Sequence, residues 1–164
     1  MLQRAIESYR QKHQAPILNR ASELFSALTV GDHRGLTTDF GDDDKPVLVA
    51  IRRNGEHVGV EGLSDGTRDQ LYLALRLAAI EHHVSSVTPC PLILDDILIN
   101  SDDARSSAAL RAICDLAHRT QVLFFTHHRR MAELGISAGA QLVELDAPVA
   151  PPAEPGARRC DASR

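Results

Sequence analysis

The sequence predicts an α/β domain in which a parallel sheet with flanking helices follows a small antiparallel β meander. From about residue 67 onward, helical segments alternate with short, continuous apolar strands, the pattern of a parallel sheet covered on both faces. Earlier in the chain, Asn54-Gly55 lies between two strand-like segments and favours a tight hairpin. The chain has 164 residues, which is enough for one domain with its own core.

The first part of the chain is expected to form a helix and three strands. Residues 2–28 carry a broken apolar stripe at helical spacing, and Pro16 should kink or restart that helix. The segment is either an ordinary packed amphipathic helix or the end of a coiled coil that returns to a globular head. The predicted strands are GLTTDF (35–40), PVLVAI (46–51) and EHVGV (56–60).

The second part of the chain alternates between helices and strands. We predict helices over about 67–83 and 103–119, each followed by an apolar strand, in PLILDDILI (91–99) and QVLFFTHH (121–128). A shorter helix and a last strand, AQLVEL (140–145), follow. The proline-rich residues 147–164 are predicted to be a disordered tail.

Composition narrows the class of protein. The chain is 43% hydrophobic but only 4% aromatic, so the core should consist mostly of aliphatic side chains, and its net charge of −4 gives no sign of a broad basic surface for nucleic acid. Cys90, Cys114 and Cys160 are widely spaced and fit no CxxC metal pattern. The polar N-terminus is unlike a signal peptide, and no apolar run has membrane-spanning length. A cytoplasmic protein without membrane contact is the expectation.

Polar side chains end both predicted parallel strands. Asp95-Asp96 follows PLIL, and one carboxylate at such an edge can hold Mg²⁺ while its neighbour accepts a proton from water. His127 and His128 follow the other strand, where a histidine can touch a phosphate or orient water. The simpler alternatives are a solvated turn after the first strand and exposed histidines after the second.

The third polar feature is the start of the long helix. Ser64 can cap this helix, Thr67 and Gln70 have capping-box spacing, and Gly66 allows close approach to the backbone. Free amides at a helix N-terminus attract anions. Simple capping of a core helix is the alternative, but it gives no reason for the whole stretch Ser-Asp-Gly-Thr-Arg.

The order of these motifs resembles the heads of ABC-type ATPases in the SMC and DNA-repair branch. LSDGTRDQ is similar to the signature motif, PLILDD to the Walker B strand, INSDDAR to the D-loop and FFTHH to the switch-histidine strand. Within that branch, the bacterial YhaN-like AAA-family ATPases share LSxGTRDQLYLALRLA and FTHH. The resemblance covers roughly residues 31–145. It implies the C-terminal half of an ABC ATPase head of P-loop NTPase type, with a coiled-coil stub (1–28), a lobe (29–146) and the tail (147–164).

The resemblance also implies roles for residues that act across two heads. In this family the signature binds the nucleotide held by the opposite head, so Ser64, Gly66 and Thr67 would face its γ-phosphate. Arg68 would add polar contacts near the signature. Asp102 would be the D-loop aspartate that communicates across the dimer.

Other residues would act within one head. Asp95 matches the aspartate that binds magnesium. Asp96 stands where most relatives have a catalytic glutamate, and it is one methylene shorter. His127 matches the switch histidine, with His128 as the second candidate.

One motif that the resemblance requires is missing. The phosphate-cradling Walker A loop, GxxxxGK[ST], has no counterpart, because Lys12 follows Gln11 and Lys45 follows Asp44. In arm-bearing relatives this loop lies before the coiled coil. We therefore expect a C-terminal lobe that binds ATP weakly by itself, exposes a strand edge or apolar face, and requires a Walker A lobe. A fragment, a truncated gene product and a piece of a split protein all remain open.

Three functions follow as hypotheses. The first is an ATPase half-head that uses ATP and Mg²⁺, dimerises with a second head and contacts DNA through the assembled complex, in DNA repair or chromosome maintenance. The second is a truncated, non-catalytic partner that binds a homologous head. The third is a metal-dependent hydrolase using Asp95, Asp96, His127 and His128.

Overall fold

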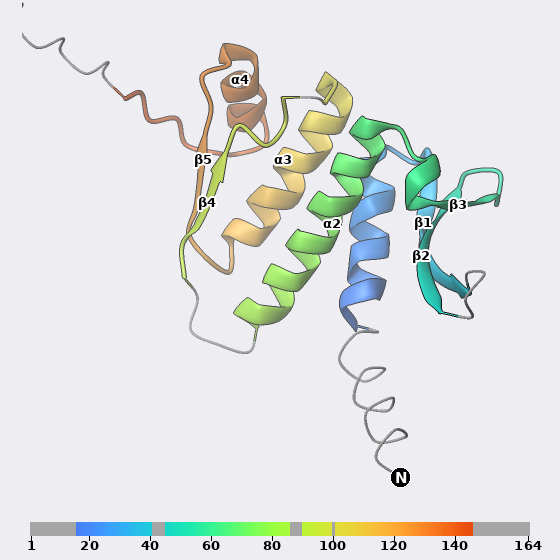
Figure 1. The fold of residues 1–164 in the computed structure, drawn as a ribbon. Helices are drawn as coiled ribbons and strands as arrows, with labels where there is room; N and C mark the ends of the chain where they lie inside the picture. The colour runs from blue at the N-terminus through green and yellow to red at the C-terminus, as the bar shows by residue number, and fades with distance from the viewer. Residues whose placement is uncertain (1–15, 41–44, 86–89, 100, 146–164) are drawn as a thin grey trace, which may run out of the picture.

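The computed structural model describes residues 16–40, 45–85, 90–99 and 101–145, which form two small sheets with long helices between them (Figure 1). The N-terminal helix is described over residues 16–28. The remaining elements, in chain order, are β1 (His33–Phe40), β2 (Pro46–Arg52), β3 (His57–Gly59), the short 3₁₀ helix η1 (Val60–Gly62), α2 (Asp65–Val84), β4 (Leu92–Asp95), α3 (Asp103–Ala117), β5 (Val122–Phe125) and α4 (Arg129–Ser137).

The antiparallel meander is confirmed. Strands β1, β2 and β3 pair in sequence order, with Leu36 opposite Ala50 and Ala50 opposite Val58, and all three side chains are buried. The predicted Asn54-Gly55 turn joins β2 to β3. Gly55 has a φ of +89°, which a glycine adopts without strain, and the Asn54 side chain accepts a 3.0 Å hydrogen bond from the backbone N–H of residue 56.

The parallel sheet consists of β4 and β5, paired in register from Leu92 opposite Val122 to Asp95 opposite Phe125. Side chains alternate across a strand, and here one set packs against the core while the other is exposed. The exposed set includes Ile93, which is 66% exposed, and Phe125, which is 41% exposed. The predicted coverage of both faces is therefore wrong for the described residues, whereas the apolar face expected of a lobe without its Walker A partner is exposed as predicted. One face is covered, and the described part of the chain supplies no element for the other.

The core lies between the two sheets and joins the N-terminal helix to α2 and α3. Phe25, Leu71 and Leu116 are among its fully buried side chains. At its edge, Glu81 of α2 accepts two hydrogen bonds from the Arg20 guanidinium, at 2.6 and 3.1 Å. This forked ion pair fixes the N-terminal helix against α2.

The predicted helices are confirmed, but the last predicted strand is not. Residues 140–145 form no strand, and Val143 and Leu145 are more than 70% exposed. A strand needs a neighbour for its backbone N–H and C=O groups, and none of the described strands lies beside this segment.

Some expectations fall outside the described residues: the first part of the N-terminal helix (1–15), the tail (147–164), and the acidic run Asp42–Asp44, whose sequence suggests a solvated loop. No helix within the described ranges has the length and apolarity needed to span a membrane.

Candidate active site

The predicted motifs meet at one end of the molecule. Helices α2 and α3 begin at the end where β4 and β5 finish, the top of Figure 1. This follows from the alternation of strands and helices, because each helix runs back antiparallel to the strand next to it. The signature-like cap, the D-loop-like turn and both polar strand ends therefore share one edge, as expected for a ligand site in an α/β fold.

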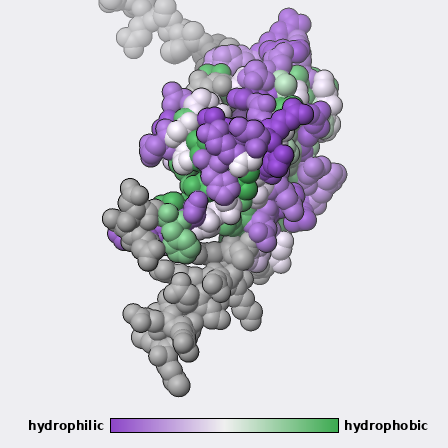
Figure 2. Space-filling model, turned by 90° about the vertical axis from the view of Figure 1, so that its right-hand side faces the viewer, coloured by the Kyte–Doolittle hydropathy of each residue, from purple (hydrophilic) through white to green (hydrophobic). Residues whose placement is uncertain are grey.

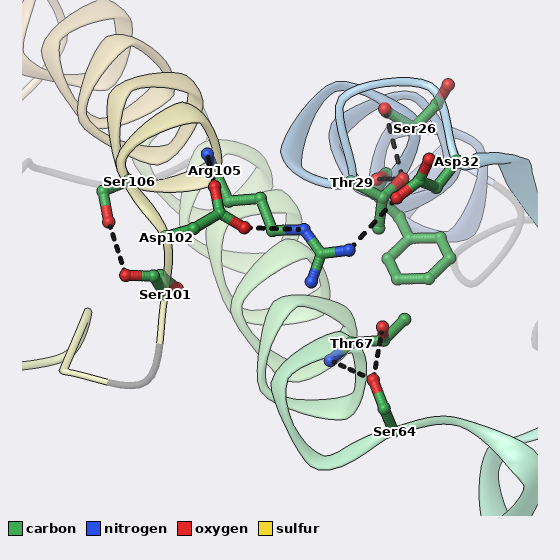
Figure 3. Close-up of polar contacts among 10 residues, drawn as sticks. Ser26, Thr29, Asp32, Ser64, Thr67, Ser101, Asp102, Arg105 and Ser106 are labelled. Atoms are coloured by element: carbon green, nitrogen blue, oxygen red, sulfur yellow. Dashed lines mark hydrogen bonds and ion pairs between the residues drawn. The ribbon is translucent and has the colours of Figure 1, made fainter.

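Ser64 caps α2 at this edge (Figure 3). Its Oγ accepts a hydrogen bond from the Thr67 backbone N–H at 3.3 Å and lies 2.9 Å from the Thr67 hydroxyl. Ser64 is exposed and Thr67 is buried. The buried Thr67 therefore holds the Ser64 side chain in place, while Ser64 stays accessible to solvent. The predicted Thr67–Gln70 capping box is wrong. Ser64 is the cap, Thr67 already lies inside the helix, and the buried Gln70 Oε1 makes no hydrogen bond to the described residues.

Arg68 makes the polar contacts near the signature that were expected of it. Its Nη2 donates to the Leu63 carbonyl at 3.3 Å and to Asp65 at 3.1 Å. These bonds hold the turn that precedes Ser64, so Arg68 supports the shape of the cap. Gly66 lies in the first turn of α2 between Asp65 and Thr67 and is partly exposed.

Asp102 caps α3 and is tied to the rest of the site through Arg105 (Figure 3). Asp102 Oδ1 accepts a 2.9 Å hydrogen bond from the Arg105 backbone N–H, and its Oδ2 lies 3.4 Å from Arg105 Nε. The same guanidinium donates to Asp32 at 3.1 Å. Arg105 thus joins the D-loop-like turn to the turn between the N-terminal helix and β1.

The two acidic residues at the end of β4 have different environments. Asp95 is the last residue of β4 and is exposed. Asp96 follows with a φ of +44°, a left-handed conformation, and its backbone N–H donates to the Phe125 carbonyl at 3.0 Å. The carboxylate of Asp96 forms a 2.6 Å contact with Nδ1 of His127.

The surroundings of Asp96 favour its charged form. The Thr126 side chain has the largest influence and lowers the pKa of the Asp96 carboxyl, and His127 lowers it further. Asp96 Oδ1 is buried without a hydrogen-bond partner among the described residues. Asp96 therefore presents a carboxylate that His127 holds through one oxygen.

His127 and His128 extend from the end of β5. Their ring centroids are 3.9 Å apart, and both side chains are exposed. An ionised carboxylate hydrogen-bonded to an imidazole can take up or release a proton at a nearby water. The strand ends therefore place a carboxylate–imidazole pair, Asp96 and His127, beside the carboxylate of Asp95, which is exposed and forms no ion pair with the described residues.

The structure brings together the predicted residues of β4 and β5, and it places Ser64, Gly66, Thr67 and Asp102 at the neighbouring helix ends. Sequence reasoning missed Arg105 and Asp32. The spacing of Asp102 and Arg105 suits a pair within one helical turn, which was a usable signal. Asp32 is 73 residues from Arg105 and gave no signal.

Comparisons with known proteins support the fold described above. No family model matches the chain. A structure from a study of ATP-driven dimerisation and DNA-stimulated activation of SMC ATPases superposes with a TM-score of 0.64 at 17% identity, covering 77% of this chain and 76% of that one. The chain has the fold of an SMC ATPase head.

Other comparisons support the same fold for this SMC-like head region. The Smc head of Pyrococcus yayanosii, with coiled coil and joint, gives a TM-score of 0.62 at 18% identity over 80% of this chain and 25% of its own. The uncharacterised protein YhaN of Bacillus subtilis is 30% identical over 135 residues, 81% of this chain. The family resemblance predicted from the motifs is confirmed. The chain spans only 14% of the length of YhaN.

Proposed function

We propose that this SMC-like head region is the C-terminal half of an ATPase head that hydrolyses ATP after joining a Walker A lobe and pairing with a second head. The observation that carries the proposal is the Asp96–His127 contact of 2.6 Å, at the same end of the fold as the open Ser64 cap. Such a head would act in DNA repair or chromosome maintenance, with DNA bound by the assembled complex.

Each half of the divided site has a role in this proposal. Ser64, Gly66 and Thr67 bind the γ-phosphate of ATP held by the other head, supported by the dipole of α2. Asp102 contacts that head at the dimer interface. Ser64 suits this role because it is exposed while its hydroxyl is held by Thr67.

The residues at the ends of β4 and β5 act on the nucleotide that is bound by the same head. Asp95 fits a place beside Mg²⁺, because its carboxylate is exposed and forms no ion pair among the described residues, and a hard cation prefers oxygen donors. When bound there, the ion would neutralise phosphate charge. Asp96 accepts a proton from the attacking water, and His127 orients Asp96 and senses the γ-phosphate.

The missing lobe would pack on the exposed face of the β4–β5 pair. Ile93, Leu123 and Phe125 are 66, 40 and 41% exposed and lie on the side that no described element covers. Exposed apolar side chains grouped on one sheet face are typical of an interface. We expect the Walker A lobe to cover them and residues 140–145 to gain a strand partner in the completed head.

Nucleotide assays on the chain with and without a lobe test this proposal. The probe is the N-terminal lobe of YhaN, where the resemblance places the Walker A loop. We expect weak MgATP binding by the chain, and ATP turnover after mixing that is lost in the Asp95→Asn variant. Micromolar MgATP affinity without the lobe would contradict the proposal. Binding to the lobe without turnover would favour the non-catalytic partner.

A further inference from the structure

Asp96, His127 and His128 bring together three ligand atoms of the kinds that bind metals. One carboxylate oxygen and two ring nitrogens all lie within 4.8 Å of one another. Asp95, the proposed magnesium ligand, is not a member of this group. Within the part of the chain that the structure describes, no other His, Cys, Asp and Glu side chains cluster in this way.

We infer that Asp96, His127 and His128 form a binding site for a divalent transition-metal ion, with Zn²⁺ as the best-suited ion. Two imidazole nitrogens and one carboxylate oxygen are a donor set that zinc accepts, and three protein ligands leave a fourth position open to water or a phosphate oxygen. Mg²⁺ prefers oxygen ligands in octahedral geometry. The two histidines therefore select against the ion proposed for Asp95.

The site needs only small side-chain movements to bind the ion. Ligand atoms about 2.1 Å from a tetrahedral zinc ion lie roughly 3.4 Å from one another. The Asp96–His127 contact of 2.6 Å must open, and the wider separations, up to 4.8 Å, must close. The His127 side chain is 71% exposed, whereas the Asp96 side chain is 21% exposed and its backbone is tied to β5 by the bond to Phe125. The two exposed histidines therefore have more room to move toward the ion than the Asp96 carboxylate has.

Metal binding and the Asp96–His127 hydrogen bond exclude each other. In the proposed site the ion binds Asp96 Oδ2 and His127 Nδ1, the two atoms that share the contact at 2.6 Å. This consequence rests on the proposed function: with both groups bound to zinc, Asp96 no longer accepts a proton from water. Zinc is therefore an inhibitor of turnover in the completed head.

The first experiment measures metal binding by the 164-residue chain without nucleotide. Calorimetric titration with Zn²⁺ should give one ion per chain, and Co²⁺ should give the visible absorption of a low-symmetry nitrogen and oxygen site. Loss of one ligand, in Asp96→Asn or His128→Ala, should weaken Zn²⁺ binding by at least about tenfold.

A second pair of adjacent histidines provides the matched control. His82 and His83 are both exposed in the last turn of α2 and lie outside the cluster. The His83→Ala variant should bind Zn²⁺ as tightly as the wild type. Equal loss of affinity in His83→Ala and His128→Ala, or a thiolate-to-cobalt charge-transfer band from the cysteines, would overturn the site.

The second experiment adds Zn²⁺ to the completed head in the presence of MgATP. Turnover of the wild type should fall, and His128→Ala should lose this sensitivity when each protein is compared with its own zinc-free rate. A wild type that binds Zn²⁺ but keeps its turnover would overturn the inhibitory role. A completed head without any turnover would contradict the proposed function, while the binding measurement on the chain would still test the metal site.

Discussion

The antiparallel sheet β1–β3 and the parallel pair β4–β5 differ in what covers them. The meander places Leu36, Ala50 and Val58 against the helices, where they are buried, and Figure 2, a view from its side of the molecule, shows a largely hydrophilic surface. The parallel pair has no fully buried residue, and Ile93 and Phe125 on its outer face are exposed. The helices cover the inner face of the meander, although Phe40 and Val47 near its far end are 71 and 42% exposed, whereas no described element covers the outer face of the parallel pair.

The sharpest contrast is between Phe25, in the core that the meander covers, and Phe125 on the outer face of the parallel pair. Phe25 is fully buried in the N-terminal helix and packs near His33, with ring centroids 5.0 Å apart. Replacing Phe25 by alanine should lower the free energy of unfolding by about 3–5 kcal/mol, because it leaves a cavity in a closed core. Urea denaturation followed by circular dichroism measures this loss.

The matched variant is Phe125→Ala on the open face. Because this side chain is 41% exposed, we expect a loss of less than about 1 kcal/mol in the chain by itself. Its effect should instead fall on association with the Walker A lobe, by about 2 kcal/mol or more, measured by calorimetry. Equal destabilisation by both variants would show that the parallel pair is as well covered as the core.

The ion pair between the N-terminal helix and α2 provides a second test of the covered core, at whose edge it lies. Glu81→Ala removes both hydrogen bonds to Arg20, and we expect a loss of about 1–2 kcal/mol in the free energy of unfolding, since half-exposed Arg20 regains water. Glu23 contacts the same guanidinium at 2.9 Å, but its side chain is 69% exposed. Glu23→Ala should cost about 0.5 kcal/mol or less, and an equal loss in both variants would contradict the difference in burial.

Whether a feature could be predicted from the sequence depends on whether nearby residues determine it or whether it depends on packing between distant segments. Local signals identified the meander, both long helices and the parallel strands, because Asn54-Gly55 and the apolar periodicities act within a few residues. The strand at 140–145 was predicted from its place in the alternation of helices and apolar strands, but it needs a partner that the described chain does not supply.

Prediction of the candidate site had a similar limit. The motif order indicated Asp96 and His127, but not that they pair at 2.6 Å, nor that Asp96 adopts a left-handed conformation. The link from Arg105 to Asp32 joins residues 73 apart and depends on the folded arrangement of the N-terminal helix and α3.

The smallest expected effect is a pH dependence of the free energy of unfolding that arises from His33 in β1. His33 is buried, and burial, followed by the charges of Arg52 and Arg105, lowers its pKa against the opposing influence of Asp32. The unfolded chain therefore binds more protons below about pH 6.5, and the free energy of unfolding falls as the pH drops through that value. Urea denaturation between pH 7.5 and pH 5.5 should show a smaller fall in His33→Gln than in the wild type. The same pH dependence in both proteins would contradict the assignment to His33.

The central claim is that Ser64 serves the nucleotide of the opposite head while Asp96 serves that of its own. The most direct measurement mixes two completed heads that are each inactive, one carrying Ser64→Arg and the other Asp96→Asn. Half of randomly formed pairs would then have one intact site, so ATP turnover should recover to about a quarter of the wild-type rate. A mixture no more active than either variant would contradict the divided site.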